Sequence, residues 1–230
     1  SLKDMDTLQI FKRMRFKLSC NRLKHSRLSG YTSMRGSPPL MIVIGGPNGA
    51  GKTTAAMAVL PQALHLLEFL NADEIAKGLS PLNPTSVRIQ SSRLLLERAN
   101  KFIKNKTSFG FESTLAAGNA PEKLIRQAKE QGFLVILLYF WLSSPRLALE
   151  RVQQRVVAGG HDIPESDVLR RYERSIANLT KTYLPLADFW LVYDNSEAEL
   201  ERIAQGEQKS GLIHVYNEST WSQITQGGNE

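Results

Sequence analysis

A glycine-rich segment that ends in a lysine and two threonines is the part of this chain whose residue types and spacing most directly suggest chemistry. It reads Gly46-Pro47-Asn48-Gly49-Ala50-Gly51-Lys52-Thr53-Thr54 and satisfies the Walker A pattern. In such a segment the backbone N–H groups surround phosphate oxygens, and the helix that follows directs its positive end at the same anion. We therefore predict that residues 46–54 bind a nucleotide, with Lys52 at the β- and γ-phosphates and Thr53 at a magnesium ion.

The acceptor side of a phosphoryl transfer needs a carboxylate, and Asp73 is our candidate for it. It lies in Asn71-Ala72-Asp73-Glu74, at the end of a predicted strand. A carboxylate at this strand end can orient an acceptor hydroxyl and take its proton, and we place Asn71 beside it as a substrate-binding residue. The alternative is that Asp73 caps a helix, since Asp before Glu-Ile-Ala is a good start signal.

A second carboxylate, Glu112, follows Phe-Gly-Phe at a position where an apolar residue would fit a sheet better. It could accept hydrogen bonds from a substrate hydroxyl, with Ser113 and Thr114 as neighbours in the substrate site. It could equally order waters on Mg²⁺, as a Walker B carboxylate does. The sequence does not separate these two roles, and a salt bridge at the end of the sheet is the structural alternative.

Arginines gather between residues 151 and 174, on two predicted helices separated by a Gly159-Gly160 break. They are Arg151, Arg155, Arg170, Arg171 and Arg174, and several pairs stand at helical spacing. Arginine binds phosphate with two parallel hydrogen bonds and neutralises charge on a transferred group. We therefore expect a mobile lid over a triphosphate, with His161 as a contact residue beside its hinge. Ion pairing with Glu150, Asp167 and Glu173 is the competing role.

The elements that must position these residues alternate between strand and helix patterns. Strands are predicted at 40–44, 69–73, 108–111, 133–141 and 189–193, with a late edge strand at 212–216, and helices at 51–60, 84–104, 121–131, 145–157 and 164–179. Pro61 is expected to stop the first helix. The alternation predicts an α/β fold with a parallel sheet flanked by helices, and such sheets bind ligands beyond the carboxyl ends of their strands.

The net positive charge of the sequence comes from its first 38 residues. Residues 1–38 hold nine basic side chains against Asp4 and Asp6, whereas the remainder carries 20 basic and 20 acidic residues. We therefore divide the chain into a basic extension and linker (1–38) and a kinase domain (39–230). The extension could contact nucleic acid or an acidic surface, or it could be a solvated segment whose apolar residues from Leu8 to Leu18 form an amphipathic helix.

Neither a membrane span nor a disulfide framework is predicted. No stretch approaches about 20 consecutive apolar residues, and Cys20 is the single cysteine in the sequence. We expect a cytoplasmic protein.

These motifs, taken together and in this order, resemble the zeta toxin family of P-loop kinases. The matching elements are Gly-Gly-Pro-Asn-Gly-Ala-Gly-Lys-Thr-Thr (45–54), Asn-Ala-Asp-Glu-Ile-Ala (71–76), Phe-Glu-Ser-Thr-Leu (111–115), Gly-Gly-His-Asp-Ile-Pro-Glu (159–165), Arg-Arg-Tyr (170–172) and Asp-Asn-Ser (194–196). The resemblance covers about residues 40–225 and leaves the basic extension unexplained. It implies a P-loop NTPase fold like that of nucleoside and shikimate kinases, with a lid that carries arginines.

The resemblance also implies a function. Members use ATP or GTP with Mg²⁺ to phosphorylate the 3′-hydroxyl of the sugar in UDP-N-acetylglucosamine, and a toxin of this kind has an antitoxin protein as its partner. Asp73 would be the general base and Glu112 would bind the sugar nucleotide. For the phosphate-stabilising pair we choose Arg155 and Arg171, with Arg151 at the nucleotide and Arg170, Arg174 and His161 at the substrate. Asn195 lies in the loop that often borders the adenine in P-loop kinases.

Two departures from the family pattern leave the acceptor open. Asn71 stands where an acidic residue is usual, and His161 where an arginine is expected. Another alcohol, such as an antibiotic, a nucleoside or a polynucleotide end, is the alternative acceptor, and a non-catalytic nucleotide switch is a third reading. The neutral charge of residues 39–230 disfavours a nucleic acid partner, and the presence of both Asp73 and Glu112 favours a kinase over a switch.

Overall fold

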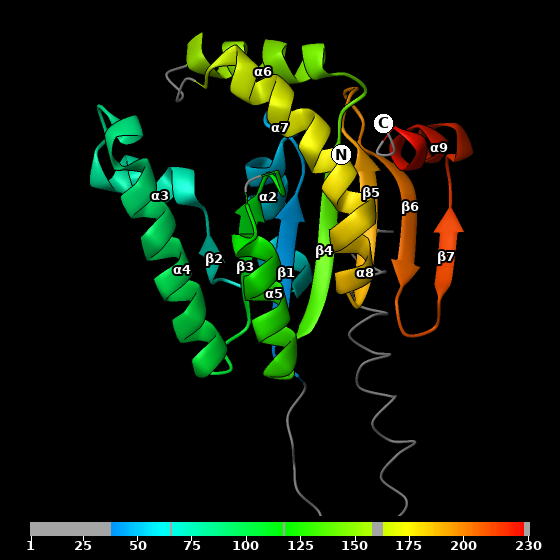
Figure 1. Cartoon of the computed structure of the whole chain (residues 1–230), viewed down its shortest axis with the longest axis horizontal. Helices are drawn as coiled ribbons and strands as arrows, with labels where there is room; N and C mark the ends of the chain where they lie inside the picture. The colour runs from blue at the N-terminus through cyan, green and yellow to red at the C-terminus, as the bar shows by residue number, and fades with distance from the viewer. Residues whose placement is uncertain (1–37, 65, 117, 158–162, 228–230) are drawn as a thin grey trace, which may run out of the picture.

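The computed structural model describes residues 38–64, 66–116, 118–157 and 163–227, which form a seven-stranded sheet with helices on both faces (Figure 1). The strands are β1 (Leu40–Gly45), β2 (Phe69–Leu70), β3 (Phe109–Ser113), β4 (Leu134–Trp141), β5 (Phe189–Asp194), β6 (Glu201–Glu207) and β7 (Leu212–Val215). Their order is β2-β3-β1-β4-β5-β6-β7. The first five are parallel, and β6 and β7 are antiparallel additions to one edge. The predicted α/β fold is confirmed.

The central strands are apolar because both of their faces are covered. In β4 every residue from Val135 to Trp141 is buried, and β1 is buried from Met41 onward. The register pairs Ile44 with Glu112 and Gly45 with Tyr139, so β1, β3 and β4 end side by side. Loops that follow these strands therefore meet at one edge of the sheet.

Helices cover both faces of this sheet, and α6 lies beyond its carboxyl edge. They are α2 (Lys52–Leu64), α3 (Ala72–Leu79), the 3₁₀ turn η1 (Pro84–Val87), α4 (Arg88–Lys104), α5 (Ala120–Glu130), α6 (Pro145–Val157), α7 (Glu165–Asn178), the π-helical segment η2 (Leu179–Tyr183), α8 (Leu184–Leu186) and α9 (Glu218–Gln226). In Figure 1, α4, α5 and α7 cover the near face, and α2 lies behind β1. Helix α6 and the start of α7 lie beyond the upward-pointing ends of the parallel strands.

Three predictions about elements are corrected by the structure, and strand β6 and helix α9 were not predicted. Helix α2 continues past Pro61 to Leu64, because a proline in the last turn has a helical φ and removes a single hydrogen bond. Strand β2 ends at Leu70 instead of residue 73, since Asn71 already caps the next helix. Strand β6 was missed, because its sequence Glu-Arg-Ile-Ala-Gln-Gly-Glu is mostly polar. The sheet is accordingly mixed, not wholly parallel.

Several sequence predictions lie outside the described residues. These are the structure of residues 1–37, the placement of His161 and the glycine break at 159–160. None of the helices among the described residues combines the length and the apolar character needed to cross a membrane.

Candidate active site

The segment between β1 and α2 takes a path that only glycine allows at its critical positions. Gly46 and Gly51 have φ angles of 140° and 75°, which side-chain-bearing residues rarely adopt. A Cβ on Gly46 would lie 2.2 Å from the Phe140 carbonyl oxygen, and one on Gly51 would lie 2.6 Å from Asn195 Nδ2. The Walker A glycines are therefore required by backbone conformation and by close packing against β4 and the loop after β5.

The loop after β5 supports the Walker A segment from the side. Asn195 Nδ2 donates a hydrogen bond of 3.0 Å to the Ala50 carbonyl. Arg151, on α6, donates to the Asn195 carbonyl and, at 2.7 Å, to the Ser196 carbonyl. Arg151 was predicted to contact the nucleotide, but its guanidinium holds the loop that carries Asn195. Nucleotide contact by Arg151 and Asn195 stays a prediction, whereas their support of the Walker A backbone is a contact of the structure.

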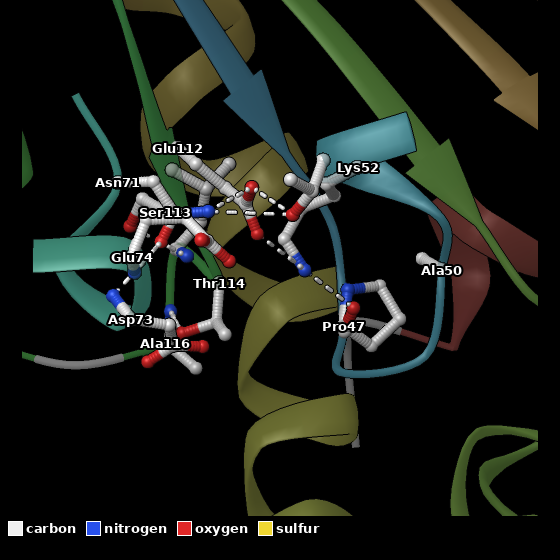
Figure 2. A network of polar contacts seen from close by, with 12 residues as sticks. Pro47, Ala50, Lys52, Asn71, Asp73, Glu74, Glu112, Ser113, Thr114 and Ala116 are labelled. Carbon is white, nitrogen blue, oxygen red and sulfur yellow. Dashed lines mark hydrogen bonds and ion pairs between the residues drawn. The ribbon is translucent and has the colours of Figure 1, made fainter. Parts of the chain in front are cut away.

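Lys52 lies buried at the centre of the site. Its Nζ donates a hydrogen bond of 2.8 Å to the Pro47 carbonyl and lies 3.7 Å from Glu112 Oε1 (Figure 2). Burial lowers the pKa of Lys52, since a low-dielectric surrounding disfavours the charged form. The carboxylates of Glu112 and Asp73 oppose that effect and raise the pKa. The side chain is thus held inside the loop that would surround phosphates.

Glu112, at the end of β3, is the hub of a hydrogen-bond network with two residues from other elements. Its Oε2 accepts hydrogen bonds from Thr53 Oγ1 at 2.6 Å and from Asn71 Nδ2 at 2.9 Å, and Figure 2 shows it between Asn71 and Lys52. The carboxylate therefore faces the hydroxyl that was predicted to hold Mg²⁺. This arrangement fits the Walker B alternative, while the ion pair with Lys52 shows that the salt-bridge alternative applies too.

Asp73 belongs to the first turn of α3, and the cap of that helix is Asn71. The Asn71 side-chain oxygen accepts the backbone N–H groups of Asp73, at 2.8 Å, and Glu74. The capping role weighed for Asp73 is therefore wrong, because Asn71 fills it. Asp73 is half-buried, and its charge acts on both Lys52 and Arg171. Asn71 thus links the position of Asp73 to Glu112 through a single side chain.

The loop after β3 is shaped by its own hydroxyl groups. Ser113 Oγ accepts the N–H of Leu115 at 3.0 Å, and Thr114 Oγ1 accepts that of Ala116 at 3.4 Å. Leu115 has a positive φ of 59° and is fully buried. Ser113 and Thr114 were predicted to bind substrate; the structure places both beside Glu112 and gives their oxygens a local structural role.

The arginines of α6 and α7 differ in their exposure and in their ion-pair partners. Arg155 is exposed near the end of α6, and its charge lowers the pKa of Lys52. On α7, Asp167 accepts from Arg170 and, at 3.2 Å, from Arg171. The ion-pairing alternative is thus met for these two, while Glu150 pairs with Arg146.

Arg171 is the least exposed arginine of α7, with 19% of its side chain exposed, whereas Arg170 and Arg174 are exposed. Burial lowers its pKa, while Asp167 and Asp73 raise it and Arg88 lowers it. Arg88, the first residue of α4, was not found by sequence analysis because no motif surrounds it. Arg174 is exposed on α7, and His161 lies outside the described residues.

Two predicted nucleotide-binding residues remain. Asn48 is buried, and its Oδ1 has no hydrogen-bond partner among the described residues, so nucleotide contact by Asn48 stays a prediction. Thr54 is exposed on α2. In the part of the chain that the structure describes, no group of three or more His, Cys, Asp or Glu side chains could hold a metal ion by itself.

Comparison with known proteins gives a family for most of this region. A family model described as an AAA domain matches residues 41–179, which span the Walker A segment, Asp73, Glu112 and the arginines of α6 and α7. An uncharacterized protein of Haemophilus influenzae is 35% identical over 127 residues, covering 55% of this chain and 88% of that protein.

Solved structures show the same fold at low sequence identity. The AvrRxo1-ORF1:ORF2 complex with ATP matches with a TM-score of 0.66 and 20% identity, over 83% of this chain and 64% of that chain. This chain thus spans just under two thirds of its length. The PezAT chromosomal toxin-antitoxin system of Streptococcus pneumoniae matches with a TM-score of 0.54 and 15% identity, over 99% of this chain and 96% of that chain. At the level of the fold, these matches agree with the resemblance to zeta toxins.

Proposed function

Because the chain belongs to the AAA domain family, we propose that it is a phosphotransferase, a kinase that moves the γ-phosphoryl group of ATP or GTP to a hydroxyl of a small molecule. The observation that carries this proposal is the convergence of three elements on Lys52. Glu112 of β3 lies 3.7 Å from its Nζ, Asp73 of α3 acts on its charge, and the Walker A carbonyl of Pro47 accepts its hydrogen bond. The loop that would bind the donor phosphates and a carboxylate on the acceptor side are thus adjacent.

The donor half would be formed by the segment 46–54. Its backbone N–H groups and the start of α2 would surround the β- and γ-phosphates, and Lys52 would exchange its bond to Pro47 for a phosphate oxygen. Asn195 and Arg151 would maintain the loop while the base lies beside them.

The residues beside Lys52 fit a magnesium ion bound together with the nucleotide. Mg²⁺ prefers oxygen ligands and usually takes only one or two from the protein, with phosphates and waters completing its shell. Thr53 Oγ1 and Glu112 Oε2, 2.6 Å apart, are such oxygens. When bound, the ion would neutralise charge on the β- and γ-phosphates.

The acceptor half would use Asp73 as general base. As the acceptor oxygen forms its bond to the γ-phosphorus, the bond to the leaving diphosphate breaks, and the acceptor proton passes to the Asp73 carboxylate. Arg171 and Arg155 would neutralise the charge on the transferred group. Asn71 would keep Asp73 in place, because its side chain caps the helix and contacts Glu112.

For the acceptor we propose UDP-N-acetylglucosamine, phosphorylated at the 3′-hydroxyl of its sugar. The resemblance of residues 40–225 to zeta toxins supports this choice, as does the shared fold with the PezAT toxin-antitoxin system. An antitoxin protein is then the partner that we propose, and residues 39–230 are the catalytic domain. Glu112, Ser113, Thr114, Arg170 and Arg174 would border the sugar nucleotide. A role of His161 in substrate binding is part of the same proposal.

The test is label transfer from γ-labelled Mg-ATP or Mg-GTP to a panel of acceptors: UDP-N-acetylglucosamine, other nucleotide sugars, aminoglycosides, nucleosides and oligonucleotides. We expect transfer to UDP-N-acetylglucosamine that is lost in Asp73→Asn. The matched control is Glu74→Gln, because Glu74 is the next residue and pairs with Lys77 at the surface. This control should retain transfer.

Other outcomes point elsewhere. Transfer to a different member of the panel would support kinase activity and overturn UDP-N-acetylglucosamine as the acceptor. Hydrolysis of ATP without transfer to any member would overturn the kinase and favour a nucleotide switch. Transfer that persists in Asp73→Asn would remove Asp73 from the mechanism.

A further inference from the structure

Helix α7 carries Arg171, a largely buried side chain that follows the buried Val168 by three residues and precedes the buried Ser175 by four. Asn178, the last residue of α7, lies seven positions after Arg171. Seven residues are about two turns, so the two side chains share one face and lie about 10 Å apart along the axis. Ser175, between them, is fully buried on this face.

Two hydrogen bonds anchor α7 on β4. The hydroxyls of Tyr139 and Ser175 lie 3.0 Å apart in the buried interface, and Tyr172 donates to the Leu142 carbonyl at 2.7 Å. These bonds fix the distance between α7 and the centre of the sheet. Neither of them reaches the loop that follows Glu112 and the end of β3.

Asn178 makes the connection to that loop. Its Nδ2 donates a hydrogen bond of 2.8 Å to the carbonyl of Leu115. Leu115 adopts its positive φ of 59° and buries its side chain completely, so close to β1 that a Cβ on Gly45 would lie 2.6 Å from Leu115 Cδ1. A positive φ is costly for leucine, and it persists where the surroundings determine it.

The hydrogen bond therefore joins three parts of the site. The segment 112–116 begins with Glu112 at the end of β3, packs against Gly45 of β1 through Leu115, and is bonded by Asn178 to the helix that carries Arg171. Directly after Asn178 the chain changes to the π-helical segment η2. π-Helical turns are frequent at functional sites and change the rotation of a helix about its axis. Asn178 is thus the last α-helical residue before this change.

We propose that Asn178 is a positioning residue for phosphoryl transfer: by holding the Leu115 carbonyl, it fixes Arg171 over the transferred group relative to Glu112 and the Walker A loop. This inference rests on the proposed function, which gives Arg171 its role. Asn178 itself touches no reacting atom.

The first experiment compares Asn178→Ala, Arg171→Ala and the double variant in single-turnover transfer from γ-labelled Mg-ATP to UDP-N-acetylglucosamine, with hydrolysis to water measured in parallel. Misplacement of a stabilising group by about 1 Å can cost about 100-fold. We expect Asn178→Ala to slow the reaction by about 10- to 100-fold, with binding of Mg-ATP unchanged within about twofold. When Arg171 is already alanine, Asn178→Ala should slow transfer by less than about twofold, because the guanidinium that Asn178 positions is absent.

Asn178→Asp distinguishes the loss of the hydrogen bond from the loss of side-chain volume, because a carboxylate has the same shape as the amide but cannot donate to the Leu115 carbonyl. It should behave like Asn178→Ala. Glu173→Gln, at an exposed position of the same helix, is the matched control and should react at the parent rate. Additive losses in the double variant, or a parent-like rate in Asn178→Asp, would overturn the inference.

A second measurement does not depend on turnover. The Nε–H signal of Arg171 in an arginine-labelled NMR spectrum, identified by its loss in Arg171→Ala, should shift when Mg-AMP-PNP binds to the parent. We expect a smaller shift in Asn178→Ala at equal saturation. An equal shift in parent and variant would overturn the positioning role alone. Absence of any shift in the parent would overturn the role of Arg171 and this inference with it, while label transfer would still report separately on the kinase.

Discussion

Replacing Glu112 by glutamine removes one charge from the site and almost none of its shape. Glu112 Oε1 lies 3.7 Å from Lys52 Nζ, and their side chains are only 14% and 6% exposed. Glutamine keeps an oxygen that can accept from Thr53 and Asn71, which now bond to Oε2. The substitution therefore removes the attraction between the carboxylate and the buried ammonium and places an amide NH₂ at the Oε1 position.

The size of the effect follows from this distance. Two unit charges 3.7 Å apart attract by about 4.5 kcal/mol at an effective dielectric constant of about 20. This figure is an upper bound, because Lys52 keeps its bond to the Pro47 carbonyl and the charge of Asp73, and can also lose its proton. We expect Glu112→Gln to lower the free energy of unfolding at pH 7 by about 1 to 3 kcal/mol.

Urea unfolding of Glu112→Gln, Lys52→Met and the double variant measures this attraction as a coupling energy. The loss caused by Glu112→Gln should shrink by at least about 1 kcal/mol when Lys52 is already methionine. Glu74→Gln is the control, because its pair with Lys77 is 47% exposed on both sides, and surface pairs contribute less than about 1 kcal/mol. Equal losses in the two backgrounds, or a Glu112→Gln protein as stable as Glu74→Gln, would refute the electrostatic reasoning.

Three further changes give independent tests. Gly51→Ala should weaken binding of a fluorescent ATP analogue by at least about 10-fold, because Gly51 has a φ of 75° and a Cβ at this position would meet Asn195. The control is Gly211→Ala: Gly211 has a φ of 65°, and a Cβ there would have nothing within 4 Å, so this variant should bind the analogue like the parent. Burial lowers the pKa of Lys52 in the folded protein below 10.5, the value of the unfolded chain. Between these two pKa values the unfolded chain binds more protons than the folded protein, so the free energy of unfolding should rise with pH in that interval. Lys52→Met should flatten that rise, and an unchanged slope would contradict the assignment. Tyr172→Phe should lower unfolding free energy by about 1 to 2 kcal/mol, because it removes the 2.7 Å bond to the Leu142 carbonyl; no loss would show that the bond is replaced by water.

The central strands and the phosphate-binding segment could be predicted because local sequence determines them. The run from Phe133 to Trp141 is apolar on both faces, and Gly46 and Gly51 sit where the backbone needs positive φ. The rule that loops after parallel strands meet at one edge then brought Asp73 and Glu112 to the site.

The remainder depends on contacts between distant residues. The preference of Asn71 over Asp73 as the helix cap arises because the Asn71 amide also contacts Glu112, which the local sequence cannot show. Arg151 appeared suited to phosphate, but its partners are carbonyls 44 and 45 residues away. Asn178 has no motif, and its partner Leu115 is 63 residues earlier in the chain.

The bond from Asn195 to the Ala50 carbonyl joins residues 145 positions apart, and this separation has a consequence for biosynthesis. A ribosome produces the Walker A segment early and the loop after β5 much later. A growing chain can therefore display the whole nucleotide-binding motif while Gly51 still lacks the side chain that packs against it. Nucleotide capture should begin only once residue 195 has left the exit tunnel, so a ribosome-stalled fragment that ends at residue 180 should not retain ATP.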